Sequence, residues 1–308
     1  MGGPDLSKVP KHILMDIAAS KNIELHPRER INSIRMKLYE NLSYDELIEY
    51  TIDHVFAGRT SSVYFKYSSI EGRTQENITG ENIGEILTLL CNGRDPFDYS
   101  SRPDLTSNFQ IINARYLDNN NKLLISFAKK GHEKWLLDGY RYRTYTKTDW
   151  INSIMYLNDN IFEARAAKNL AKKCSNYFFN HLLAQDDLYI QDAQFKMIRD
   201  SDFIRIKNKL NARVRTYKGR DITGKYQSRE ITGHKQDNLY DVDGFQEDIG
   251  DLDTPNSKLI FDSPTQQDYE IVIRVNTQEG YITFLSPYAS EGDMDYVYNA
   301  LKTLNIVR

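Results

Sequence analysis

The spacing of apolar residues changes at Gly58, and this change divides the chain into parts that must fold differently. Before it, residues 8–57 hold three runs in which apolar residues recur every three or four positions, the period of an amphipathic helix. Ser43 and Glu46 have the spacing of a capping box at the start of the third run. After Gly58, residues 61–69 alternate between polar and apolar types, which favours a strand. We therefore expect a small helical domain followed by a sheet.

The next residues carry the patterns of an antiparallel sheet and one long helix. The runs 109–117, 122–129 and 134–146 read as strands, and the Asp-Asn-Asn-Asn sequence between the first two favours a hairpin turn. The clearest helical pattern covers 159–184, with Cys174 in its apolar stripe. We expect this cysteine to be part of the core rather than a nucleophile.

The remainder reads as a polar segment and a small C-terminal unit. Residues 218–257 are poor in aliphatic side chains, and that length without periodicity is typical of a mobile loop or projecting arm. Strands over 269–275 and 280–286 and a helix over 292–304 follow. The fold class is therefore α+β: a small N-terminal helical domain, a mixed, mostly antiparallel sheet domain with a long helix, and a C-terminal strand-strand-helix unit. The expected bounds of these parts are 1–58, 59–217, 218–257 and 258–308.

Composition excludes several classes of protein. The only cysteines, Cys91 and Cys174, form no disulfide framework, and no cluster of His and Cys has the spacing of metal ligands. No apolar run reaches the roughly 18–20 residues that span a bilayer. We expect an intracellular protein, cytoplasmic or nuclear, with no cofactor, no metal and no membrane partner.

Charge is strongly segregated along the chain. Residues 196–235 hold 12 Lys/Arg against 4 Asp/Glu, whereas residues 236–308 hold 4 against 14. The total charge of −3 therefore divides into +7 for residues 1–235 and −10 for the remainder. A basic body favours a polyanionic partner, and the acidic region is expected to compete for that surface or to bind a protein partner or a second copy.

The strongest binding candidate is the basic and aromatic run from Tyr140 to Tyr145. Alternate side chains of a strand face opposite sides, so Arg141 and Arg143 are expected to share one face and to hold backbone phosphates. The alternative is a sheet with one buried tyrosine face and one solvated arginine face. Three lysines lie close in sequence: Lys129, Lys130 and Lys147.

Two other elements present basic residues on one face. Five basic residues of the strand expected over 203–217 occupy positions of the same parity, where like charges repel unless an anion lies nearby. Arg165, Lys168 and Lys172 share one face of the expected long helix. With the basic second helix of the N-terminal domain, the expected nucleic-acid contacts are Arg28, Arg30, Arg35, Lys37, Lys129, Lys130, Arg141, Arg143, Lys147, Arg165, Lys168, Lys172, Arg205, Lys207, Lys209, Arg213 and Arg215.

A nuclease is one alternative, of the kind found in restriction or mobile-element defence systems. The PD-(D/E)xK pattern would begin at Asp104 and end at Lys129, but Phe127 stands where an acid is needed. A displaced arrangement with Asp118 and Lys122 stays open. A third possibility is a protein-only adaptor or inhibitor whose basic face meets an acidic protein.

The order of elements resembles one known family. Val9-Pro10 before a small helical domain, the hairpin YLDNNNKLLIS, the strand YRYRTYTK and the helix DNIFEARAAKNLAKK are similar in layout to the centromere protein N family. The resemblance implies binding of nucleosomal DNA through a basic groove between the first two domains, and pairing with a partner through the C-terminal part. No histone-reading residue can be aligned. We therefore expect non-enzymatic binding of duplex DNA, in chromatin if the resemblance holds.

Overall fold

The computed structural model describes residues 6–26, 28–68, 82–98, 103–117, 121–138, 141–183, 192–195, 198–221, 228–234, 238–249, 252–253 and 256–307. The chain forms two compact units. Unit 1 comprises residues 1–60 and 198–305, and unit 2 comprises residues 61–197 and 306–308. Helices accompany strands that pair antiparallel, which confirms the α+β class.

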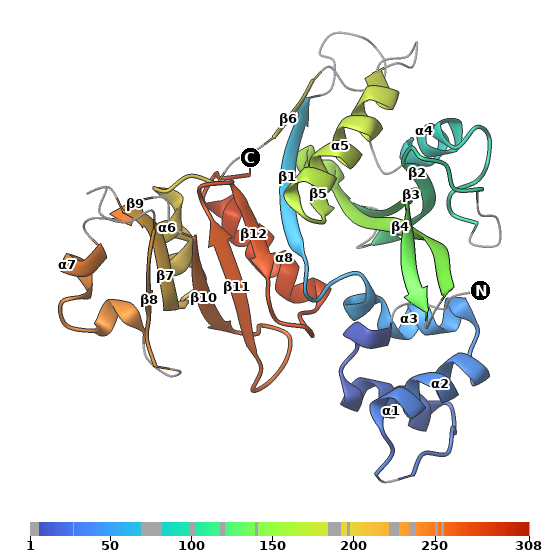
Figure 1. Ribbon diagram of the computed structural model, residues 1–308, viewed down its shortest axis with the longest axis horizontal. Helices are drawn as coiled ribbons and strands as arrows, with labels where there is room; N and C mark the ends of the chain where they lie inside the picture. Colours follow the sequence, from blue (N-terminus) through green and yellow to red (C-terminus); the bar gives the residue numbers. More distant parts are fainter. Residues whose placement is uncertain are drawn as a thin grey trace. The chain divides into compact units, whose positions relative to one another are not determined.

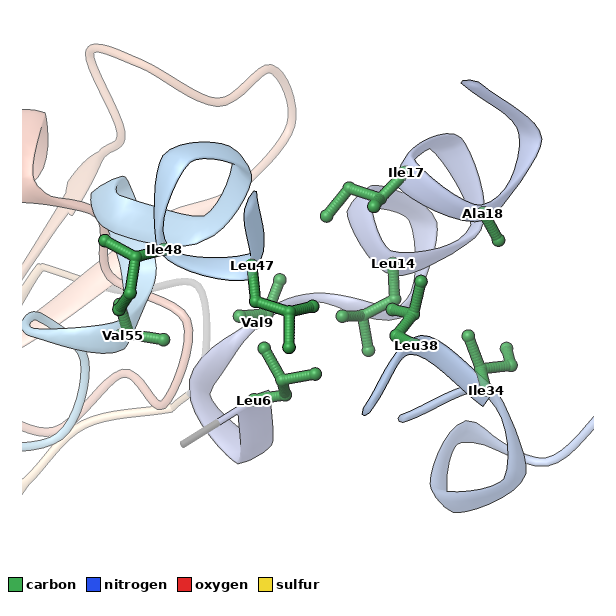
Figure 2. Close-up of a cluster of buried hydrophobic side chains, with 10 residues drawn as sticks. All are labelled: Leu6, Val9, Leu14, Ile17, Ala18, Ile34, Leu38, Leu47, Ile48 and Val55. Carbon is green, nitrogen blue, oxygen red and sulfur yellow. The ribbon is translucent and has the colours of Figure 1, made fainter. Parts of the chain in front are cut away.

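Unit 1 begins with the three expected helices. Ser43 caps the third helix: its hydroxyl accepts from the backbone nitrogen of Glu46 at 3.3 Å, and the Glu46 carboxylate accepts from the Ser43 nitrogen at 3.0 Å. Figure 2 shows the apolar side chains of these helices gathered in one cluster, which includes Leu14, Ile34 and Leu47. The elements are η1 (Leu6–Lys8), α1 (Lys11–Ser20), α2 (Ile31–Asn41) and α3 (Tyr44–Val55).

The helical part is joined closely to the C-terminal part of unit 1. Gly58 has a φ of 81°, and a Cβ at this position would lie 2.8 Å from the carbonyl oxygen of Pro287, so a side chain is excluded. Two residues later, the Thr60 carbonyl accepts from the Phe284 nitrogen at 2.7 Å. The end of the helical part is therefore held against the chain that leads to the last helix.

A sheet with one long covering helix forms the rest of unit 1. Its strands lie in the order β12-β11-β10-β7-β8, with β9 beside β7, and Met294, Val297 and Leu301 of the last helix are buried. The expected C-terminal strand-strand-helix unit is confirmed. The strands are β7 (Arg213–Asp221), β8 (Arg229–Thr232), β9 (Leu252–Asp253), β10 (Asn256–Asp262), β11 (Glu270–Asn276) and β12 (Tyr281–Phe284); the helices are α6 (Asp202–Lys209), η3 (Leu239–Asp241), α7 (Phe245–Ile249) and α8 (Glu291–Thr303).

The single strand expected over 203–217 is wrong. The structure has helix α6 and then β7, and Asn211, with a φ of 50°, lies in the turn between them. Phe203, Ile206 and Leu210 are buried at helical spacings of three and four. This region also belongs to unit 1, whereas the sequence grouped it with the preceding sheet.

The segment 218–257 differs from the expected loop or arm wherever the structure describes it. It contains β8, η3, α7 and β9, all short. Leu239, Phe245 and Leu252 are buried, and the Phe245 ring meets the rings of Tyr217 and Tyr240 edge-on. A few widely spaced apolar residues thus pack against β7 and hold the otherwise polar segment 218–257 in place.

Unit 2 is an antiparallel sheet with helix α5 packed against it (Figure 1). Its strands lie in the order β2-β3-β4-β5-β1, with β6 also paired to β1. The Phe178 ring of α5 stacks on Phe162 at 5.3 Å and meets Phe127 edge-on at 5.4 Å. The elements are β1 (Ser61–Ser68), α4 (Ile83–Leu90), β2 (Gln110–Leu117), β3 (Lys122–Asp138), β4 (Arg141–Tyr156), η2 (Leu157–Asp159), β5 (Ile161–Arg165), α5 (Lys168–Leu183) and β6 (Asp192–Phe195).

Two expected elements of this unit have different bounds. The helix expected over 159–184 begins only at Lys168, because residues 161–165 form β5, which is buried on both faces. The strand expected over 134–146 is divided between β3 and β4. The expected turn at 118–121 lies largely outside the described residues.

A buried ion pair lies on β5. Glu163 and Arg165 have side chains that are each 1% exposed, and Arg165 Nη2 lies 3.2 Å from Glu163 Oε2. The same carboxylate accepts from the Ser62 hydroxyl at 2.5 Å and from the Tyr156 hydroxyl at 3.1 Å. Because these donors come from three neighbouring strands, the carboxylate fixes the order β4-β5-β1 through side chains as well as backbone.

We predict that Glu163→Ala lowers the free energy of unfolding by about 3–5 kcal/mol, because it leaves the Arg165 charge buried without its acid. Denaturant unfolding measures this change. Glu133→Ala, which removes an exposed acid from β3, is the matched control and should stay within about 0.5 kcal/mol. Equal effects of the two substitutions would contradict a structural role for the pair.

Candidate nucleic-acid interface

Strands β3 and β4 continue together beyond the sheet of unit 2. They pair from Lys122↔Tyr156 to Asp138↔Arg141, whereas β2 reaches β3 only as far as Ala128 and β5 reaches β4 only as far as Asn152. Within the described parts of the chain, residues 129–138 therefore have strand partners only in residues 141–149, and Trp150 pairs with Ala128 at their base. The Lys130 nitrogen also donates to the Thr106 carbonyl at 2.6 Å. We call residues 129–138 and 141–150 the ribbon; Figure 1 shows the two green strands side by side beyond the other strands.

A β-bulge marks the base of the ribbon. The register shifts between Lys130 and Glu133 on β3, so that β3 carries one more residue than β4 over this interval. A Cβ on Gly131 would lie 2.3 Å from the Lys147 carbonyl oxygen, and only glycine fits there. Bulges bend a strand and increase its twist. The two strands of the ribbon are therefore expected to change direction at Gly131, where they leave the sheet.

Both tryptophans of the chain lie exposed on this ribbon. Trp135 is 69% exposed and Trp150 is 52% exposed. Trp135 lies opposite Thr144, and Thr144 and Trp150 are separated by an even number of positions on β4, so the two indoles belong to one face. Exposed tryptophans on one strand face are typical of an interaction site, and these two lie six residues apart along β4, counted from Thr144, which is about 20 Å.

The ribbon is also rich in basic residues, but most of them occupy the face opposite to the tryptophans. Residues 129–150 contain six Lys/Arg and three Asp/Glu. Lys129 pairs with Asp149 and Lys134 with Tyr145, which have the odd-numbered parity of Arg141, Arg143 and Lys147 on β4, whereas Lys130, opposite Thr148, shares the parity of Trp150.

The Lys129 ammonium lies 4.9 Å from the centre of the Phe109 ring and 3.9 Å from Asp149, whereas Lys130 and Lys147 are exposed. Arg141 and Arg143 occupy alternate positions at the start of β4, and their side chains lie outside the described part of the structure.

The other expected contacts in unit 2 divide into two kinds. Lys168 and Lys172 lie one turn apart on α5 and are half-buried. Arg165 was expected to join them on one helix face, and this expectation is wrong. It lies on β5, buried against Glu163, and cannot reach a partner at the surface.

The expected row of charges in unit 1 is also wrong. Arg205, Lys207 and Lys209 are on α6 rather than on a strand with Arg213 and Arg215, so the repulsion argument fails. Arg205 donates to Asp202 at 2.9 Å and to the Leu304 carbonyl at 2.6 Å, the Lys207 ammonium lies 4.9 Å from the Tyr240 ring centre, and Arg213 pairs with Glu270.

Two of the four basic residues around α2 make structural contacts. Arg35 donates to the carbonyls of Leu6 and Ser7 and thereby fastens η1 to α2. Lys37 donates to Glu29 at 3.0 Å and holds the turn before the helix. The Glu29 pKa is lowered to about 2, chiefly by hydrogen bonds from Ser33 and from the backbone of His26. Arg28 and Arg30 are exposed.

The structure therefore brings five of the expected contacts together on the ribbon and leaves the others elsewhere. The five are Lys129, Lys130, Arg141, Arg143 and Lys147.

The nuclease alternative gains no support from the geometry. Phe127 is fully buried in the core, where that pattern needs an acid, and the Lys122 ammonium lies 5.7 Å from the Tyr156 ring centre. Asp118 lies outside the described residues. Among the residues that the structure describes, no group of three or more His, Cys, Asp or Glu could hold a metal ion.

The two cysteines are not activated. Cys174 is fully buried, as its place in the apolar stripe predicted, and burial raises the pKa of its thiol. Burial also raises the pKa of the Cys91 thiol, which the nearby Arg94 guanidinium opposes. A raised pKa leaves little reactive thiolate at neutral pH.

The tryptophans are the functional candidates that the sequence patterns did not identify. Each follows a charged residue, in Lys134-Trp135 and Asp149-Trp150, within a run that alternates like a strand. Their exposure depends on β3 and β4 extending past β2 and β5, which periodicity alone does not reveal.

Comparison with models of protein families finds no match, and comparison with curated proteins finds none either. Within the described residues, no helix has the length and apolar character to cross a membrane. Function is therefore inferred from the chemistry of the ribbon.

We predict that the intrinsic tryptophan fluorescence is strongly quenched by acrylamide in the native state, because both indoles are exposed. Native and urea-unfolded protein should give similar quenching constants. Trp135→Phe and Trp150→Phe, measured singly, should each remove a quenchable component. Weak quenching of the native protein would show that the ribbon is covered.

Proposed function

We propose that this protein binds duplex DNA without chemical reaction, and that the ribbon is its principal contact. The observation that carries the proposal is the exposure of both tryptophans on one face of a basic two-stranded ribbon. The major groove of B-DNA admits a two-stranded β-ribbon, whose side chains then reach base edges and the flanking phosphates.

The dimensions and charge of the ribbon support this role. Ten residues per strand span about 30 Å, against a major groove about 12 Å wide, so the ribbon can follow the groove over several base pairs. Its lysines and arginines would contact phosphates, which supplies affinity without sequence preference. The indoles would add contact with sugars and base edges.

The acidic C-terminal region has a separate role in this proposal. It carries a net charge of −10, against +7 for residues 1–235, and would bind a protein partner or a second copy rather than DNA. If the resemblance to the centromere protein N family holds, the DNA is nucleosomal.

We predict that DNA affinity falls steeply with salt and that Arg141→Ala/Arg143→Ala flattens the plot of log affinity against log salt by about 2 units, because each phosphate contact contributes about 0.9. Fluorescence anisotropy of a labelled duplex measures the slope. Arg205→Ala/Lys207→Ala is the matched control: it removes two cations that have partners within unit 1 and should leave the slope unchanged.

The same titrations with Mg²⁺ present, followed by gel analysis, separate the alternatives. Intact DNA and a steep slope support the proposal. Cut DNA would favour a nuclease. No binding at low salt would overturn the proposal and favour a protein partner, for which exposed tryptophans are also suited.

A further inference from the structure

Unit 1 contains a second candidate site, remote in sequence from the ribbon. It is a pocket of about 650 Å³ between the helical part and the C-terminal sheet. His12 lines it from α1, Asp53 and His54 from the last turn of α3, and Ser290 and Gly292 from the start of α8. The loop that joins β10 to β11 forms the remaining wall.

A buried polar atom in this pocket lacks a partner. His54 is only 4% exposed, and among the described residues none forms a hydrogen bond with its Nδ1. Buried ring nitrogens in native proteins are nearly always hydrogen-bonded to protein, water or ligand. His54 lines the pocket, and although Nδ1 itself is closed to solvent, a small rotation of the ring would bring it to a partner bound there.

The wall opposite His54 is held rigidly. The fully buried Asp293 carboxylate accepts from Ser263 at 2.5 Å, from Thr265 at 3.0 Å and from Gln266 at 3.1 Å, and it also caps α8 through Ser290. A Cβ on Gly292 would lie 2.5 Å from the Thr265 methyl carbon, so the close approach of loop and helix requires glycine. The loop is thus fixed in place before any ligand binds.

The electrostatics of the pocket favour a cation. Asp53 and Asp268 are exposed at its edge, and the C-terminal end of α3 adds partial negative charge. The opposing N-terminal end of α8 is already capped by Asp293. The Tyr269 side chain lines both this pocket and an adjoining one of about 490 Å³, which Met15 and Tyr288 also line. Aromatic rings beside acids suit an alkyl chain that ends in a positive charge.

We infer that this pocket binds an alkyl-ammonium or guanidinium group, with His54 Nδ1 as hydrogen-bond acceptor and Asp53 and Asp268 as the countercharges. The group could belong to a small amine or to a lysine or arginine side chain of a protein. The inference stands apart from the proposed DNA binding, because the two sites have opposite charge and are tested with different ligands.

The ionisation state of His54 fits an acceptor. Burial lowers its pKa below the ordinary value of 6.5, and His12 acts in the same direction, whereas Asp53 and Asp293 oppose the shift. The imidazole is therefore neutral at neutral pH and can accept at Nδ1 when its proton is on Nε2. Protonation at acid pH would remove this acceptor and add a repelling charge.

The test is calorimetric titration of the full chain with lysine amide, arginine amide and a short lysine- and arginine-containing peptide, with norleucine amide as the uncharged control. We expect saturable binding of the cationic probes and none of norleucine amide. A peptide that binds about tenfold or more tightly than the amides would identify a protein as the source. Equal affinities would identify a small amine. Absence of saturable binding by every cationic probe would overturn the inference.

Variants locate the binding. His54→Phe should weaken it about tenfold, since a hydrogen bond to a charged group is lost, and Asp268→Asn about fivefold. Asn tolerates the positive φ of 54° at position 268, so the second variant keeps the fold. Asp243→Asn, an exposed acid elsewhere in unit 1, is the matched control and should have no effect. Unchanged affinity in both pocket variants would overturn the inference.

The pH dependence supplies a second readout. Affinity should fall as the pH is lowered below 6.5, because the pKa of His54 lies below that ordinary value and the ring becomes protonated only there. His12, Asp53, Asp268, Asp293 and Tyr269 also face or adjoin this site. His12→Gln should keep the fall in affinity and His54→Phe should abolish it; the reverse result would contradict the role given to His54.

Discussion

The antiparallel pairing of β3 with β4 is the constraint on which the rest of unit 2 depends. Its first half lies within the sheet, where Phe127 packs against α5 and the Glu163 carboxylate ties β5 to its neighbours. In the second half, residues 131–138 and 141–147 have no neighbouring strand on either side within the described residues. Their register is nevertheless fixed, because the pairing continues from the first half. The sheet therefore presents the ribbon at a defined orientation without burying it.

Gly131 lies at the transition between these halves. The bulge requires a residue without a side chain, because the Lys147 carbonyl occupies the space of a Cβ. The buried apolar residues of the two strands lie on the sheet side of Gly131, and exposed residues such as Trp135, Tyr145 and Lys147 lie beyond it. Trp150 and Lys130 are exposed on the sheet side, close to the bulge, so the part available for binding begins just before this backbone irregularity.

The segregation of charge has a different meaning in three dimensions than along the chain. The most basic segment is divided between α6 and β7 of unit 1, where Arg205, Lys207 and Arg213 have partners within the unit. Conversely, part of the acidic excess surrounds a pocket with a buried histidine. The number of charged residues in a segment shows where the chain is basic or acidic. The contacts of each side chain decide whether its charge is available to a partner.

Much of the fold follows from apolar spacing. The three N-terminal helices and the C-terminal strand-strand-helix unit were predicted because each buries one face, so its period is visible. Residues 161–165 were mistaken for helix because both faces of β5 are buried and no alternation remains. Residues 203–217 were mistaken for a strand because Ile204 and Ile206 alternate with charged residues, which concealed the helical spacing of Phe203, Ile206 and Leu210.

The candidate site was predicted only in part. The basic positions of the ribbon were identified from strand alternation. The exposure of Trp135 and Trp150 depends on how far neighbouring strands extend, and the His54 pocket depends on contacts between residues more than 200 positions apart. Neither the exposure of the tryptophans nor the pocket beside His54 can be predicted from a local sequence pattern.

The most direct test of the account is acrylamide quenching of tryptophan fluorescence with and without a saturating DNA duplex, with binding monitored separately by anisotropy of the labelled duplex. If the ribbon is the DNA contact, the duplex should protect both indoles from the quencher. DNA binding that leaves the quenching of Trp135 and Trp150 unchanged would contradict the ribbon as the DNA contact and assign the contact to another surface.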